Sequence, residues 1–179
     1  MKMRNLKKSI YLILYYSFAR YLPVSYTFFG KILHSKQIRY YICKHIFKRI
    51  GKNVNIERKA YFGSGKDLEI GDNSGLGVNC VVPNNVIIGK DVMMGPNCYI
   101  LTQNHKFDDL DIPMNKQGFT RGYQTIIEDN VWIGRNVTMT PGRHISLGSV
   151  IGACCLLCKD FPENSIVGGN PSRLIRTRG

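Results

Sequence analysis

The chain has 179 residues, with 25 Lys and Arg against 12 Asp and Glu, which gives a formal charge of +13. Hydrophobic residues make up 44% and charged residues 21%, so the composition excludes a disordered chain, a collagen and a highly charged tail protein. A chain of this length forms one domain with room for an appendage, and it buries roughly 70% of its unfolded surface without needing a disulfide or metal staple.

The positive charge is concentrated at the front of the chain. Residues 1–49 hold 11 Lys and Arg and no Asp or Glu, whereas residues 50–179 hold 14 basic and 12 acidic residues. A strongly basic protein first suggests nucleic-acid binding, but this needs the charge on one folded surface with aromatic side chains that stack on bases. A nearly neutral body with a basic front end does not favour that function, and we expect no nucleic-acid partner.

Residues 1–20 combine basic, aromatic and aliphatic residues. The apolar stretch 10–19 ends at Arg20 and is too short to span a bilayer, which takes about 20 residues. No signal-peptidase site follows it, so we expect a cytoplasmic protein. Two interpretations remain open for the front segment. It lies on an anionic membrane surface, which would make the protein peripheral at the inner face of the membrane, or it forms a helical cap that packs its aromatic face on the body.

A six-residue repeat runs through the rest of the chain. In single-letter code the chain reads IGDNSG, LGVNCV, VPNNVI, IGKDVM, MGPNCY and ILTQNH from Ile70, and IEDNVW, IGRNVT, MTPGRH, ISLGSV and IGACCL from Ile127. Earlier copies begin at Ile50 and Ile56. This period fits neither a helix of 3.6 residues per turn nor a long alternating strand. It predicts a triangular solenoid whose first hexad residue points into the core and whose fifth residue fills a corner.

The repeat also accounts for most of the six cysteines. Cys80, Cys98 and Cys155 occupy the fifth hexad position, where a small buried hydrophobic residue is expected. The pair Cys155 and Cys158 has the spacing of half a zinc site, but no second pair or spaced histidine pair accompanies it. We therefore expect reduced thiols and no bound metal.

The hexads resemble those of the hexapeptide-repeat acyltransferases. That resemblance implies a mainly β fold, a left-handed parallel β-helix of three hexads per turn, and assembly as a homotrimer. The expected organisation is a basic N-terminal helical cap or membrane-surface segment over residues 1–49 and a β-helix over residues 50–179. The register breaks at residues 62–69 and again at 106–126, and the second break predicts an extruded loop of the kind that often carries function.

Four segments resemble the sugar O-acetyltransferases, the branch that contains maltose and galactoside acetyltransferases and enzymes of polysaccharide biosynthesis. They cover residues 102–107, 112–118, 130–134 and 168–173. The resemblance implies transfer of an acetyl group from acetyl-coenzyme A to a hydroxyl of a sugar, in surface or capsular polysaccharide synthesis. The acceptor would be a small-molecule or lipid-linked saccharide.

His105 closes the last hexad before the extruded loop, where a side chain can face a groove instead of the core. Acetyl transfer requires removal of a proton from the attacking alcohol, and imidazole suits this task near neutral pH. The resemblance places the catalytic histidine at this position and implies direct attack without an acyl-enzyme. Asp108 is a candidate for orienting or binding on the loop; Asp109 and Asp111 are equally open.

The resemblance also implies binding residues for the acceptor and for coenzyme A. On the acceptor side it indicates Asn79, although a strict register would place Gly77 there. Trp132 would form a wall of the groove, with packing in a corner as the alternative. The coenzyme A contacts would come from the backbone and from cationic side chains suited to phosphate: Gly134, Arg135, Ala153, Cys158, Lys159, Arg173 and Arg176.

Three other functions remain open: N-acetylation of an amino sugar, acetylation of serine, and a non-catalytic solenoid used for assembly. Serine acetyltransferases usually have a longer helical front domain than 49 residues supply. The γ-class carbonic anhydrases share the β-helix but need three zinc-binding histidines, and only His105 and His144 lie in the repeat region. The sequence does not identify the acceptor sugar.

Overall fold

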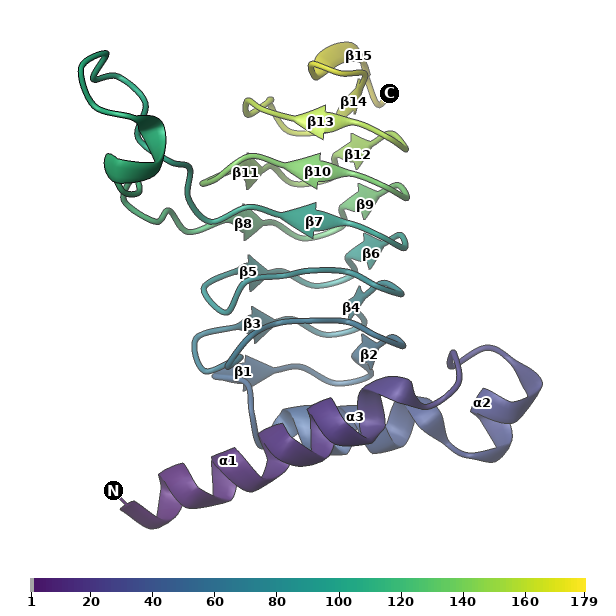
Figure 1. The fold of residues 1–179 in the computed structure, drawn as a ribbon. Coiled ribbons are helices and arrows are strands. Elements are labelled where there is room, and N and C mark those ends of the chain that lie inside the picture. Colours follow the sequence, from purple (N-terminus) through teal and green to yellow (C-terminus); the bar gives the residue numbers. More distant parts are fainter. Residues whose placement is uncertain (1) are drawn as a thin grey trace.

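The computed structural model describes residues 2–179, with side chains from Leu6 onward. Helices occupy the N-terminal part, and a stack of short-stranded coils follows, giving the parallel β-helix with an N-terminal helical segment that the repeat predicted (Figure 1). The helical elements before the first coil are α1 (Lys2–Ser17), η1 (Ala19–Tyr21), α2 (Phe28–Ile32) and α3 (Ser35–Lys44).

Each coil contributes one short strand to each of three faces. The first face consists of β1 (Arg49–Ile50), β3 (Glu69–Ile70), β5 (Ile87–Ile88), β8 (Ile126–Ile127) and β11 (His144–Ile145). The second face contains β2 (Asn55–Ile56), β4 (Gly75–Leu76), β6 (Met93–Met94), β9 (Trp132–Ile133), β12 (Val150–Ile151) and β14 (Ser165–Gly168), with β15 (Arg173–Thr177) antiparallel to β14. The third face contains β7 (Tyr99–Ile100), β10 (Thr138–Met139) and β13 (Leu156–Leu157), extended by bridges between Tyr61, Val81 and Tyr99.

The predicted core positions are confirmed. The first hexad residues from Ile56 to Leu157 are all buried, and so are the small or β-branched fifth-position residues, including Cys80, Cys98 and Cys155. The polar fifth residues Asn104 and Arg143 are exposed and half-buried, respectively. A cysteine thiol fits the buried fifth position because its volume is small and it needs no strong hydrogen bond. Core packing is therefore repeated coil by coil, and each coil supports its neighbour through parallel backbone hydrogen bonds.

Asparagines in left-handed backbone conformations turn the chain at the corners. At the corner between the second and third faces, here named the second corner, Asn79, Asn97 and Asn136 have φ values of 58°, 60° and 57°. Asparagine tolerates this region better than most residues. Their side chains form a ladder, since Asn79 Nδ2 donates to Asn97 Oδ1 at 3.1 Å and Asn97 Nδ2 donates to Asn136 Oδ1 at 3.0 Å.

The extruded loop leaves the solenoid after β7 and returns at β8. Its neck begins earlier than the expected residue 106, because Thr102 O already accepts a hydrogen bond from Tyr123 N at 3.1 Å. Farther out, a short antiparallel pairing joins His105 and Phe119, and η2 (Met114–Lys116) lies beyond it. Gln117 ties the tip together through bonds to the backbone oxygens of Asp109 and Ile112.

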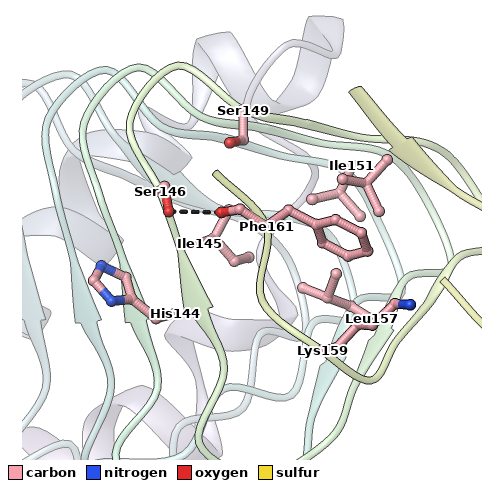
Figure 2. Close-up of a pocket in the computed structure, with 9 residues that line it drawn as sticks. His144, Ile145, Ser146, Ser149, Ile151, Leu157, Lys159 and Phe161 are labelled. Carbon is pink, nitrogen blue, oxygen red and sulfur yellow. Dashed lines mark hydrogen bonds between the residues drawn. The ribbon is translucent and has the colours of Figure 1, made fainter. Parts of the chain in front are cut away.

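The last coil is two residues shorter than the regular repeat of 18, as Phe161 bridges Ile145. Ser146 Oγ donates to Phe161 O at 2.8 Å, and the Phe161 ring lies over Ile151 and Leu157 (Figure 2). The cavity enclosed there measures about 10 Å³, which is room for one water molecule at most. This end of the core is therefore closed by Phe161 and cannot admit a substrate.

The helical cap packs on the first coil through α1 and α3. Tyr15 is fully buried and its hydroxyl donates to Ala60 O at 2.8 Å, while Tyr16 Oη donates to Gly63 O at 2.9 Å. The aromatic inner face predicted for this segment is thus present. No helix in the described part of the chain is long and apolar enough to cross a bilayer. Met1, part of the segment considered for membrane contact, lies outside the described residues.

Arg39 on α3 is the largest fully buried side chain at the junction between cap and solenoid. Its guanidinium donates to the backbone oxygens of Ile56, Leu22 and Pro23 and to Ser25 Oγ, and it pairs with the Glu57 carboxylate at 3.4 Å. Burial lowers the pKa of Arg39, and the charge of Glu57 opposes that effect. The junction is therefore polar and fully bonded at its centre.

Candidate functional site

His105 lies on the neck of the extruded loop with its side chain exposed. Its backbone pairs with Phe119, and the two rings lie against each other at a centroid distance of 4.3 Å with a tilt of 35°. Neighbouring hydrogen bonds fix the neck, because Asn104 N donates to Thr120 Oγ1 at 2.9 Å and Lys106 N donates to Gly118 O at 3.0 Å. The histidine is thus held on one side by an aromatic ring and open on the other.

Within the described residues, no carboxylate is bonded to His105. Asp109 accepts a hydrogen bond from Asp111 N at 3.0 Å and shapes the loop tip, while Asp108 is exposed. The sequence left open which aspartate orients the histidine, and within this chain the Phe119 ring is the contact that does so.

A groove on the third face begins at the foot of this loop. It has a volume of about 330 Å³ and is lined by aromatic, aliphatic and amide groups, among them Tyr61, Tyr99, Asn84 and Gln103. Gln103 lies two residues before His105, so the groove leads to the catalytic candidate. Gln103 falls within the singled-out segment 102–107, whereas Tyr61, Tyr99 and Asn84 were not among the residues predicted from the sequence. Tyr61 and Tyr99 occupy sixth hexad positions, and the recurrence of tyrosine there was the available signal.

A second groove, on the second face, combines Trp132 with Arg176. It has a volume of about 480 Å³, an apolar floor that includes Val150 and Ile166, and two arginines, Arg176 and Arg178, at its edge. The indole of Trp132 is half exposed on the outer surface of β9 and does not fill a corner. A groove with an aromatic and aliphatic floor and a cationic edge suits a ligand that has an apolar arm and phosphate groups.

Gly134, Arg135 and Ala153 lie in adjacent turns of the second corner. A Cβ on Gly134 would come within 2.6 Å of Ala153 N, so only glycine permits this coil spacing. The Gly134 N–H donates to Ile151 O at 2.8 Å and is engaged in the coil ladder. The N–H groups of Arg135 and Ala153 make no hydrogen bond within residues 2–179, and both residues are exposed. These two N–H groups are therefore free to donate to a ligand.

Asn79 lies in the same corner, two coils below Asn136. Its amide is engaged in the asparagine ladder and its left-handed φ turns the chain, so it has a structural task in addition to any contact with a substrate. Gly77, the alternative position, cannot accept a side chain because a Cβ would lie 2.2 Å from Gly95 O.

The remaining predicted residues gather near the C-terminal end. Cys158 N donates to Ser172 Oγ at 3.2 Å, and the Ser172 hydrogen bond to the thiol lowers the pKa of Cys158. Ser172 therefore brings the exposed Arg173 close to Cys158, and exposed Lys159 lies with its ammonium 5.8 Å from the Phe161 ring. Three cationic side chains, Lys159, Arg173 and Arg176, are thus presented by the last two coils.

The loop leaves from a different corner of the solenoid than the one that holds Gly134, Arg135 and Ala153, whereas Lys159 follows β13 at the loop's own corner. Figure 1 shows the loop leaving at the left, between β7 and β8, whereas the turns that follow β9 and β12 lie at the right. Within one chain, His105 is therefore separated from Arg135 and Ala153 by the width of the third face. Among the described residues no three His, Cys, Asp or Glu side chains lie close enough to hold a metal ion.

A second histidine, His144, pairs with a carboxylate outside these grooves. His144 Nε2 lies 2.7 Å from Glu128 Oε1 on the first face, and Glu128 Oε2 accepts a hydrogen bond from Leu147 N at 2.7 Å. Figure 2 shows the His144 ring pointing away from Phe161 and the small cavity. The bonds from His144 and Leu147 lower the pKa of Glu128.

Glu128→Gln is expected to destabilise the protein modestly at neutral pH. A carboxylate whose pKa is lowered by folding stabilises the fold above its unfolded pKa of about 4.3, and that contribution disappears as the pH falls through the folded pKa. The difference in free energy of unfolding between wild type and variant should therefore shrink in acid. Urea unfolding over a pH series measures it, and a difference that stays constant with pH would exclude the ionised pair as its cause.

Comparisons with known proteins support the repeat and the fold described above. The family model of the bacterial transferase hexapeptide, with six repeats, matches residues 67–102. A maltose O-acetyltransferase from Clostridium difficile 630 superposes with a TM-score of 0.75 at 29% identity, covering 99% of this chain and 89% of that one. In both sequence repeat and fold, the chain is similar to the hexapeptide-repeat acyltransferases.

Two further similar proteins bear on the ligands. A galactoside acetyltransferase solved in complex with coenzyme A has a TM-score of 0.76 at 28% identity, covering 99% of this chain and 83% of that one. The galactoside O-acetyltransferase of Escherichia coli (strain K12) is 33% identical over 137 residues, which is 75% of this chain and 66% of that protein. The chain thus spans just under two thirds of that curated relative's length.

Proposed function

We propose that the protein transfers an acetyl group from acetyl-coenzyme A to a hydroxyl of a saccharide, with His105 as general base. The observation that carries this proposal is the open side of His105 beside the third-face groove. Tyrosine rings with amide groups suit a sugar, which offers an apolar ring face and many hydroxyls. The relatives that act on maltose and galactosides support the same substrate class.

In this mechanism the groove holds the saccharide so that one hydroxyl reaches the free nitrogen of His105. The imidazole takes the proton as the oxygen attacks the thioester carbonyl, and the same proton is available to the departing thiol. No acyl-enzyme is needed. The Phe119 ring restricts the imidazole to one orientation, which removes part of the entropic cost of aligning base and hydroxyl.

The donor fits the second-face groove and the second corner. Acetyl-coenzyme A supplies an activated acetyl group; Arg176 would bind its phosphates, and Lys159 and Arg173 lie at the same end. The Arg135 and Ala153 N–H groups suit the amide oxygens of the pantetheine arm. The complex of the galactoside acetyltransferase with coenzyme A supports a site of this kind.

Arg176→Ala is expected to raise the KM for acetyl-coenzyme A about tenfold or more while kcat changes little, because a charged hydrogen bond to phosphate contributes uniform binding. The measurement is initial-rate thiol release at varied acetyl-coenzyme A. Glu163→Ala, an exposed change near the same end, provides the control. An unchanged KM would remove Arg176 from the donor site.

We further propose a homotrimer in which the loop of one protomer reaches the second corner of the next. This arrangement follows from the separation of His105 and Arg135 within one chain, since a shared site between protomers would bring base and donor together. The activity belongs, in this proposal, to surface or capsular polysaccharide synthesis, which an open groove suited to an extended saccharide supports.

The alternative acceptor is an amino sugar, since an amine could occupy the same groove. Thiol release from acetyl-coenzyme A across nucleotide-linked sugars, lipid-linked oligosaccharides, amino sugars and serine distinguishes the cases. Release with hydroxyl acceptors alone supports the proposal. The absence of both release and coenzyme A binding would favour a non-catalytic solenoid.

A further inference from the structure

Helix α1 is apolar on both its inner and its outer side. The inner side packs the fully buried Tyr15 against the first coil, and Ala19 of the following η1 is fully buried as well. The outer side carries Leu6, Ile10 and Ile13, which are 66%, 51% and 67% exposed and recur at helical spacing. A surface helix normally presents polar residues to water, and a helix that is apolar all round is normally covered on both sides. The outer side of α1 therefore calls for a covering partner.

Helix α2 carries further exposed apolar residues at the same end of the solenoid. Phe28, Phe29 and Ile32 are 72%, 66% and 57% exposed, and α2 lies with α1 at the end of the solenoid opposite the C-terminus (Figure 1). The short helix is fixed in place by its cap, because Thr27 Oγ1 accepts a hydrogen bond from Gly30 N at 3.1 Å. Its aromatic side chains thus stand on an ordered support. The exposed apolar residues of α1 and α2 are named here the cap surface.

Charge identifies the partner. Exposed Lys7 and Lys31 lie within α1 and α2, and residues 1–49 contain 11 basic residues and no acidic one. Two copies of the cap surface would bring like charges together, whereas an anionic bilayer offers apolar depth and negative headgroups at once. Large aromatic and aliphatic side chains with flanking lysines are the composition of interfacial membrane helices.

We propose that the cap surface docks the protein end-on to an anionic membrane, with the solenoid standing away from it. The inner side of α1 packs on the protein and the outer side enters the bilayer interface, so both sequence-based interpretations of this segment apply, each to one side of the helix. The surface also includes α2, which lies outside residues 1–20.

The docking has a consequence for the acceptor, which rests on the proposed function. Tyr61, at the near end of the third-face groove, lies with its ring 5.6 Å from that of Tyr16 in the cap. A docked protein would hold the entrance of the groove beside the membrane and His105 farther out. This placement suits a saccharide carried on a lipid anchor.

The test is flotation of the full chain with vesicles of phosphatidylglycerol and phosphatidylcholine, compared with vesicles of phosphatidylcholine alone. Wild type should bind the mixed vesicles strongly and the neutral ones weakly. The double variant Ile13→Glu, Phe29→Glu should lower binding to the mixed vesicles at least about tenfold, because two charges replace buried apolar contacts. Lys7→Gln and Lys31→Gln should each lower it about fivefold.

Ile175→Glu is the matched control, since Ile175 is 66% exposed and lies at the opposite end of the solenoid. It should bind vesicles as wild type does, and circular dichroism should show every variant folded. Failure of wild type to bind, or equal binding by the double variant, would overturn the proposal. If the double variant bound vesicles normally but had a smaller mass by light scattering, the cap surface would be an interface between copies of this chain, which would also overturn the proposal. Acetyl transfer to a soluble acceptor tests the proposed function separately.

Discussion

His105→Ala is expected to lower kcat for acetyl transfer by about 10²–10⁴ while leaving the fold intact. The loss reflects removal of the base that takes the hydroxyl proton. The fold should persist because the imidazole is exposed and its one ring contact is with Phe119 on the same loop. The measurement is single-acceptor turnover at saturating acetyl-coenzyme A, with thermal unfolding recorded in parallel.

His144→Ala is the matched control for that experiment. His144 is also exposed and also in the solenoid, but it pairs with Glu128 on the first face, away from both grooves. It should retain near wild-type turnover. If His105→Ala kept more than about a tenth of the activity, another group would have to act as the base, because general-base catalysis contributes at least 10²-fold.

The fold was predictable from the sequence because the residue types within each hexad determine its local backbone conformation and which side chains face the core. An apolar first residue, a small fifth residue and an asparagine that tolerates left-handed φ recur together, so Ile133, Asn136 and Val137 carry the same information as Met94, Asn97 and Cys98 one coil earlier. These local, repeated patterns predict the fold without any information on long-range contacts, because in a solenoid each coil contacts only its neighbours.

The grooves were less predictable, because they depend on outward-facing residues that no repeat constrains. Trp132 and Arg176 are 44 positions apart in the chain and meet only because β14 and β15 extend the second face. Tyr61 and Tyr99 line one groove because both pair with Val81 in the coil between them. The loop also begins earlier than the predicted residue 106. The hydrogen bond from Tyr123 N to Thr102 O closes its neck, and the hexad pattern does not reveal this bond.

For the helical cap, the sequence did not predict which residues face the solenoid and which face outward. Its composition suggested both packing on the body and membrane contact, and composition alone could not assign residues to one side. The structure separates Tyr15 and Ala19 from Leu6, Ile10 and Ile13 by burial. Tyr15 and Tyr16 hold α1 through bonds to Ala60 O and Gly63 O, and Arg39 holds the segment that follows α1 through Leu22 O and Pro23 O. No sequence pattern places this arginine in the interior.

Arg39→Met is expected to reduce the free energy of unfolding by about 3–5 kcal/mol, because it leaves the buried Glu57 carboxylate without its cation. The backbone oxygens of Leu22 and Pro23 also lose their donor, which loosens the segment between α1 and α2. Urea unfolding followed by circular dichroism measures the change. The nearby exposed Arg58 supplies the control, and Arg58→Met should change stability by less than about 0.5 kcal/mol.

The double variant Arg39→Met, Glu57→Gln separates charge from packing. In the wild type, Ser25 N donates to Glu57 Oε2 at 3.1 Å. The neutral amide of Gln at position 57 can still accept this hydrogen bond, and it leaves no uncompensated charge. The double variant should therefore be more stable than Arg39→Met alone, although the orphaned backbone oxygens keep it below wild type. If the double variant were no more stable than the single one, Arg39 would hold the cap through its backbone contacts, and the ion pair would contribute nothing to its docking.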